Sequence, residues 1–146
     1  MNDLKIFLKK FKSDTLLLSA PANQADIENL QNTFKISLPD DYKYFLYCSD
    51  GLQGHLGTLY LSLWSVNDIL RLNALYAIQN RLGKNTLGIG TDGGDYCFLI
   101  DNSNGKSNLM VVPLNALDND EKKYLSDNFT DGLLNIANGN ITGDDL

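Results

Sequence analysis

The sequence has 146 residues, of which 43% are hydrophobic, and its formal net charge at pH 7 is −6. This length matches one ordinary domain with its own core, and the composition excludes a disordered chain. No apolar run approaches the roughly 20 residues of a membrane-spanning helix, and the acidic balance argues against nucleic-acid binding. We therefore expect a single cytoplasmic domain over 1–146, with a disordered tail over about 141–146.

Three helices are predicted near the N-terminus. Apolar residues recur at helical spacing and predict a short amphipathic helix with its lysines turned to water: Leu4, Phe7, Leu8 and Phe11. Asn23 is a helix cap, and the apolar stripe after it runs from Ile27 to Phe34. Pro39 suits the start of a third helix, which Gly51 ends. The basic first segment can also touch a membrane, but so short a helix would bind weakly.

Two further helices are predicted from their capping residues. Ser65, with Asp68 three residues later, begins a helix that Gly83 ends. A last helix begins near Ser126 and is closed by Gly139.

Strands are predicted where strand-favouring residues lie between glycine or asparagine turns. The segment DYCFLID is apolar on both alternating sets, so we expect it mid-sheet and covered on both faces. Short hairpin links favour antiparallel pairing, so the expected fold is α+β, with a mainly antiparallel sheet of about four to six strands and helices around it. The predicted strands are GTLYLSLWS (57–65), TLGIG (86–90), DYCFLID (95–101) and LMVVP (109–113).

A glycine motif raises the question of nucleotide binding. The spacing Gly88-x-Gly90-x-x-Gly93 is that of a dinucleotide-binding loop, which holds phosphate because it opens a helix. Here the glycines lead into a strand, so we interpret the motif as a tight turn. Asp92 and Asp95 then either bond to nearby amides or meet a partner from an exposed loop.

Other chemistry is poorly supported. Cys48 and Cys97 are interpreted as reduced, buried, small apolar side chains. A nucleophilic pair of either cysteine with His55 is compatible with the spacing but disfavoured for Cys97, which lies in the doubly covered strand. The cysteines and the histidine lack the paired spacing of a zinc site, so neither metal nor cofactor is expected.

Several motifs in order resemble the SUKH superfamily, which includes the yeast cell-wall-assembly regulator and many bacterial immunity proteins. They are LPDDYKYFL with SDG just after it, GTLYLSLWSVNDI, IGTDGGDYCFLID and VPL, and a closing helix with Phe129. The resemblance covers the chain from Ile27 to Ile136. It implies an α+β domain that neutralises a toxin, often a nuclease, by binding it, and it implies no catalysis.

The acidic charge agrees with that implication, because a nuclease is basic where it grips phosphate. We therefore expect an immunity protein, a monomer or homodimer, that covers its cognate toxin with an acidic surface. Two alternatives stay open: a regulatory scaffold that binds cellular partners, and an enzyme with a small-molecule pocket. The expected partner-binding residues are Asp41, Asp50, Asp92 and Asp95, with Tyr42 and Trp64 as aromatic anchors if their rings are exposed.

Overall fold

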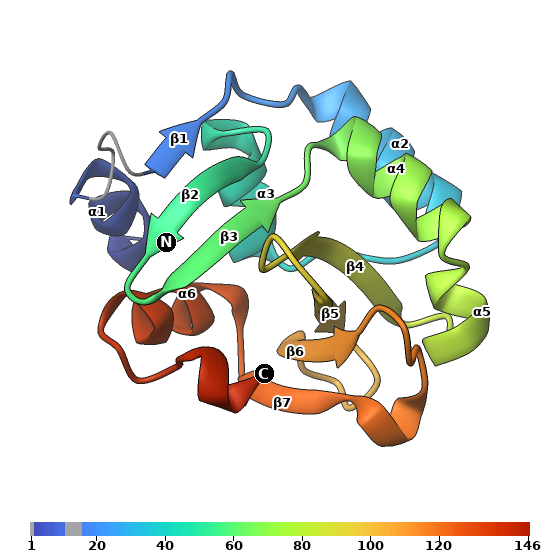
Figure 1. Ribbon diagram of the computed structural model, residues 1–146. Coiled ribbons are helices and arrows are strands. Elements are labelled where there is room, and N and C mark those ends of the chain that lie inside the picture. Colours follow the sequence, from blue (N-terminus) through green and yellow to red (C-terminus); the bar gives the residue numbers. More distant parts are fainter. Residues whose placement is uncertain (1, 11–15) are drawn as a thin grey trace.

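A computed structural model describes residues 2–10 and 16–146 and confirms the α+β fold (Figure 1). Phe11, predicted in the first helix, lies outside the described residues. The helices are α1 (Asn2–Lys10), α2 (Gln24–Phe34), α3 (Asp40–Cys48), α4 (Val66–Leu75), α5 (Ile78–Leu82) and α6 (Phe129–Ala137), with one-turn 3-10 helices η1 (Asn119–Glu121) and η2 (Gly143–Asp145).

The described strands form one antiparallel sheet of seven strands, in the order of the chain. Three of them were not predicted. β2 contains a glycine, which disfavours strands, and the short β1 and β7 are set by pairing at the two sheet edges. The strands are β1 (Leu16–Leu18), β2 (Leu52–Leu56), β3 (Leu59–Leu63), β4 (Thr86–Thr91), β5 (Tyr96–Asp101), β6 (Asn108–Pro113) and β7 (Lys123–Ser126).

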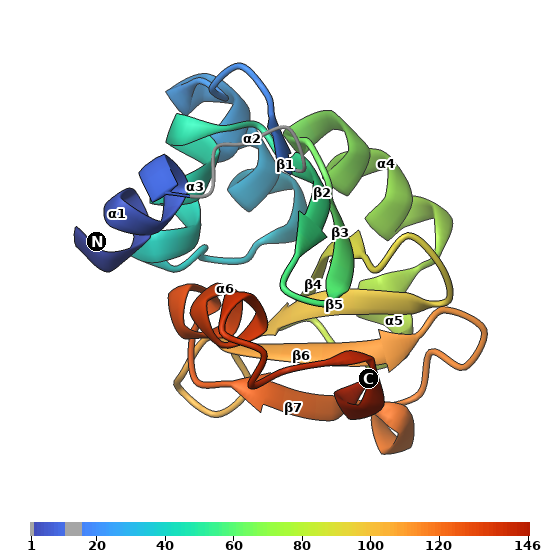
Figure 2. The same ribbon diagram turned by 60° about the vertical axis from the view of Figure 1, so that its left-hand side comes forward.

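Helices lie on both sides of this sheet. Figure 2 shows α1, α3 and α6 on one side of β2 and β3, with α4 on the other side. The central strand β5 is buried from Cys97 to Asp101, which confirms that it is covered on both faces. The front of β2 and β3 stays free of helices in Figure 1.

Local caps begin the helices as the sequence predicted. The side chain of Asn23 accepts a hydrogen bond from the Asp26 amide at 2.8 Å, and that of Ser65 accepts one from the Asp68 amide at 3.2 Å. The helix predicted from Ser65 to Gly83 is divided, however. Ala77 lies between α4 and α5 with a φ of 52°, a left-handed conformation that interrupts the helical hydrogen bonds.

The last residues, for which composition predicted disorder, carry ordered structure. Thr142 and Asp145 form a reciprocal capping box around η2. The side chain of Leu146 is buried, and its carbonyl oxygen accepts a hydrogen bond from the Lys123 ammonium at 2.9 Å. Burial of the apolar Leu146 side chain therefore favours an ordered conformation of the polar segment before it.

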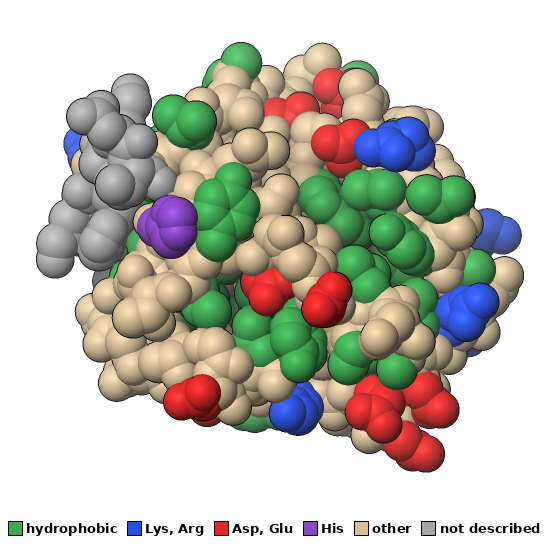
Figure 3. All heavy atoms as spheres, in the orientation of Figure 1, with side chains coloured by type: hydrophobic (Ala, Val, Ile, Leu, Met, Phe, Trp, Pro, Cys, Tyr) green, Lys and Arg blue, Asp and Glu red, His purple; other side chains and the backbone are tan. Residues whose placement is uncertain are grey.

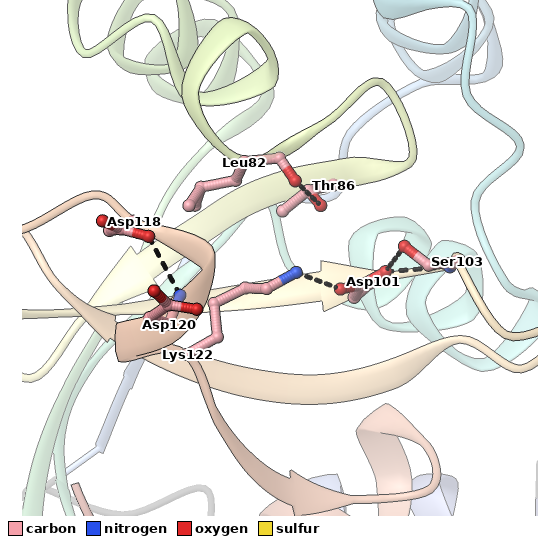
Figure 4. A network of polar contacts seen from close by, with 7 residues as sticks. All are labelled: Leu82, Thr86, Asp101, Ser103, Asp118, Asp120 and Lys122. Carbon is pink, nitrogen blue, oxygen red and sulfur yellow. Dashed lines mark hydrogen bonds and ion pairs between the residues drawn. The ribbon is translucent and has the colours of Figure 1, made fainter.

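One ion pair is buried beside β5 (Figure 4). Lys122 Nζ lies 2.7 Å from Asp101 Oδ2, and the exposed fractions of the two side chains are only 13% and 7%. The amide and hydroxyl of Ser103 donate hydrogen bonds to the other carboxylate oxygen. Burial alone would raise the pKa of Asp101, but the bonds from Lys122 and Ser103 hold that pKa below its ordinary value.

Candidate partner-binding surface

The front of β1, β2 and β3 is an open sheet face, named here the outer face. Leu17, Gln53 and Ser62 form one row across it in register, and His55 and Tyr60 form a second pair. Leu17 is 65% exposed, and the His55 and Tyr60 rings meet edge to face at a centroid distance of 5.2 Å. Figure 3 shows the single histidine beside a large hydrophobic side chain on this face.

The last glycine of the motif lies in the β4–β5 turn beside this face, as predicted, whereas Gly88 and Gly90 lie in β4. Gly93 has a φ of +81°, and a Cβ there would lie 2.7 Å from the Tyr60 ring, so the turn packs closely on the outer face. One oxygen of Asp92 accepts from the amides of Gly94 and Tyr96 at 3.0 and 3.2 Å. The turn is therefore held by its own carboxylate.

Asp95 differs from Asp92 in having no structural bond. Its side chain is exposed and makes no hydrogen bond or ion pair to any residue that the structure describes. Its backbone carbonyl accepts from the Leu114 amide at 2.8 Å, which fixes the position of the residue. Asp95 is therefore an exposed carboxylate on a fixed backbone, with all its acceptor capacity available.

A hollow of about 340 Å³ lies where the outer face meets the start of α4. Leu17, Gln53 and Ser62 line it from the sheet, and Asp50 and Asp68 line it from the other side. The structure thus brings Asp50 together with Asp68, which was predicted only as a capping residue. Leu17, His55 and Tyr60 were also missed as surface residues, although the alternation in β3 pointed Tyr60 away from the core.

Asp50 has a structural bond as well as a place in the hollow. Its Oδ1 accepts a hydrogen bond from the Val66 amide at 2.8 Å, which satisfies a free donor at the start of α4. The adjoining Gly51 has a φ of +90°, and a Cβ there would lie 2.5 Å from the Leu63 carbonyl oxygen. The Asp-Gly pair therefore joins the end of α3 to β3 at close range.

Asp41 lies apart from the outer face and connects two helices. Its Oδ2 accepts hydrogen bonds from the amide and the hydroxyl of Thr130, both at 2.9 Å, and its Oδ1 accepts from the Tyr42 amide. These bonds fix the first turn of α6 onto α3, which is a structural role. The proposed contact of Asp41 with a partner has no support from this geometry.

Asp41→Ala is expected to lower the free energy of unfolding by about 2 kcal/mol, because two donors of Thr130 lose their partner. Asp40→Ala is the matched control in the same helical turn. The Asp40 side chain is 87% exposed and lies 3.5 Å from Lys43 only, so its loss should cost under about 0.5 kcal/mol. Urea unfolding of both variants measures the difference, and equal stabilities would contradict the structural role.

The two aromatic candidates are buried. Tyr42 is 1% exposed and packs edge-on against Phe129 at a centroid distance of 5.0 Å. Burial, with a smaller effect of Asp50, raises the pKa of its hydroxyl. Trp64 is 7% exposed, although it borders the hollow. These rings were expected to anchor a partner only if they were exposed, and neither ring meets that condition.

No hydrogen bond joins His55 to either cysteine in the described part of the chain. His55 is exposed on the outer face, whereas Cys97 is buried in β5, where burial raises the pKa of its thiol to about 12. Cys48 is exposed at the end of α3, which corrects the expectation that both cysteines are buried. Both thiols are free.

Across residues 2–10 and 16–146, no three His, Cys, Asp or Glu side chains lie close enough together to hold a metal ion. None of the helices there combines the length and apolar character needed to cross a bilayer.

The comparison with family models identifies the domain. The SMI1/KNR4 family model (SUKH-1) matches residues 21–135, which is most of the chain. The chain belongs to the SMI1/KNR4 family (SUKH-1). The search of individually curated proteins gave no significant match, so the family model carries the assignment.

The match confirms the resemblance drawn from the motifs. It extends from the segment before α2 into α6, and includes all six residues expected at the partner-binding site. The SUKH-1 domain fits a role in protein–protein interaction, either immunity or regulation. A side chain can contact a partner only where it is exposed. Asp50, Asp92 and Asp95 are at least partly exposed, whereas Tyr42 and Trp64 are buried.

Proposed function

We propose that this SUKH-1 domain is an immunity protein that binds a cognate protein toxin stoichiometrically and does not catalyse a reaction. The observation that carries the proposal is the exposed Asp95 carboxylate, which bonds to no described residue, in the turn beside the open outer face. Exposed carboxylates next to exposed apolar and aromatic side chains suit a basic protein partner. A toxin that cleaves nucleic acid has such a basic surface, because it neutralises phosphates.

Co-expression tests the function. The chain is produced together with the toxin domain encoded next to it, and growth is compared with that of cells producing the toxin alone. We expect growth to be restored and a complex of one chain per toxin to be recovered. Continued growth arrest in the presence of the folded chain would contradict the immunity role, and a stable complex with other cellular proteins would favour regulation.

Asp95→Lys should slow association with the toxin about tenfold at low salt, with a smaller change in the dissociation rate, because exposed charges act mainly on diffusional encounter. The effect should shrink as salt is raised, since ions screen exposed charges. Glu28→Lys on α2 changes the net charge equally at another exposed site and serves as control. Surface plasmon resonance at two salt concentrations measures both variants, and equal slowing by both would indicate a net-charge effect.

A further inference from the structure

The hollow beside the outer face has a neutral floor and an acidic wall. The floor is the row formed by Leu17, Gln53 and Ser62, which are neighbours in register on three strands. Asp50 and Asp68 stand at the wall, where the chain enters α4. The floor therefore comes from the sheet, and the charge comes from the segment between α3 and β2 and from the first turn of α4.

Each wall carboxylate is fixed by one oxygen and has the other available. Asp50 Oδ1 accepts from the Val66 amide at 2.8 Å, and Asp68 Oδ1 accepts from Arg71 at 3.1 Å. Neither Oδ2 has a hydrogen-bond partner in the described part of the chain. A carboxylate oxygen accepts more than one hydrogen bond, so the wall offers positioned acceptors to an incoming donor.

The surroundings of the hollow match a protein partner. Leu17, 65% exposed, lies on its floor, and Tyr60 is exposed farther along the outer face. Arg71 already pairs with Asp68, and the outer-face residues of β1, β2 and β3 carry no lysine or arginine to neutralise the wall. Exposed apolar side chains beside an acidic wall that is only partly neutralised complement a partner that presents an apolar stem ending in a cation.

We propose that the outer face is the docking surface for the toxin, and that its hollow receives one arginine side chain of that partner. The inference rests on the proposed function and names the surface that performs it. The volume of about 340 Å³ is at the small end for ligand sites, which suits one side chain. Arginine fits better than lysine because its planar fork donates to two acceptors at once.

The test uses the ¹⁵N-labelled full chain and a blocked glycine–arginine–glycine peptide, with the citrulline peptide as its neutral isostere. The arginine peptide should shift the amide NMR signals of Gln53, Ser62 and Ser65 in a saturable way, and the citrulline peptide should not. Asp68→Asn should weaken binding about threefold, as expected for an exposed ion pair, and Asp120→Asn should not. Both replacements are at exposed carboxylates, so the fold is retained.

A second variant fills the hollow from its floor. Ser62→Arg places a cation of the chain itself beside the wall and should abolish the arginine-dependent shifts. Asn115→Arg, at an exposed position outside the hollow, should leave them intact. Equal shifts with arginine and citrulline, or shifts centred on Asp118 and Asp120, would overturn the inference.

Binding of the variants to the toxin tests this inference separately from the proposed function. Loss of toxin binding in Ser62→Arg but not in Asn115→Arg supports the docking surface. Unchanged toxin affinity in folded Ser62→Arg overturns the docking surface and leaves the immunity function standing. Failure of the unaltered chain to rescue growth, with arginine shifts still at the hollow, refutes the function and supports a cation-binding surface for another protein.

Discussion

Lys122→Met is expected to lower the free energy of unfolding at pH 7 by about 3 kcal/mol, because it leaves the Asp101 carboxylate buried without its cation. The two side chains are almost fully buried and their charged atoms lie 2.7 Å apart. Methionine keeps most of the apolar stem of lysine, so the loss of stability measures the effect of removing the charge. Asp101→Asn combined with Lys122→Met removes both charges and should recover much of the stability, which a double-mutant cycle by urea unfolding measures.

The same pair predicts a dependence on pH. Because the pKa of folded Asp101 is lowered, its contribution is present above the ordinary carboxyl pKa, about 3.9, and is lost as pH falls through the lowered value. In Lys122→Met, burial is no longer opposed by the ammonium, so the pKa of Asp101 should rise. The difference in the free energy of unfolding between the unaltered chain and Lys122→Met should then shrink as the pH falls from 7 to 4. A difference that stays constant over this range would contradict a buried charge at Asp101.

Asn73→Ala is expected to lower the free energy of unfolding by about 3 kcal/mol, because it leaves buried backbone groups without partners. Asn73 is 2% exposed, and its side chain bonds the amide and the carbonyl of Gly88, each at 2.8 Å. Its amide also donates to the Ile69 carbonyl at 2.9 Å. The Asn73 side chain of α4 therefore bonds the backbone amide and carbonyl of Gly88 in β4.

The need for Asn73 follows from the sheet. β3 and β4 pair only at Ser62–Thr91 and Leu63–Gly90, after which the Trp64 amide still reaches the Ile89 carbonyl and the chain turns into α4. Beyond that point Gly88 has no strand on that side. Asn80→Ala, an exposed asparagine of α5, is the control and should change stability by under about 0.5 kcal/mol. Hydrogen exchange should show lost protection at Gly88 only in Asn73→Ala.

Local signals predicted most helices and the central strands, because each signal lies within a few residues of its partner. The Asn23 and Ser65 caps act three residues away, and the two apolar sets of β5 are read directly from alternation. The β4–β5 turn was predicted for the same reason, since Asp92 bonds within its own loop. Of the candidate site, the sequence thus identified the Asp92–Asp95 turn.

The rest depends on contacts between residues far apart in the chain. Asp41 meets Thr130 across 89 residues, and that pairing gives Asp41 a structural role that its position in a helix does not reveal. The edge strand β1 forms because Leu16–Leu18 pairs with β2, and this pairing creates the outer face and the floor of the hollow.

By itself, then, the sequence determined the α+β fold, the family and the acidic turn, because periodicity, caps and charge are local properties. The tertiary structure decided which aromatic rings are buried, which carboxylates hold the fold together, and which remain available at the hollow. Those properties depend on the long-range packing that brings β1, β2, β3 and α4 together, and no single segment encodes that packing.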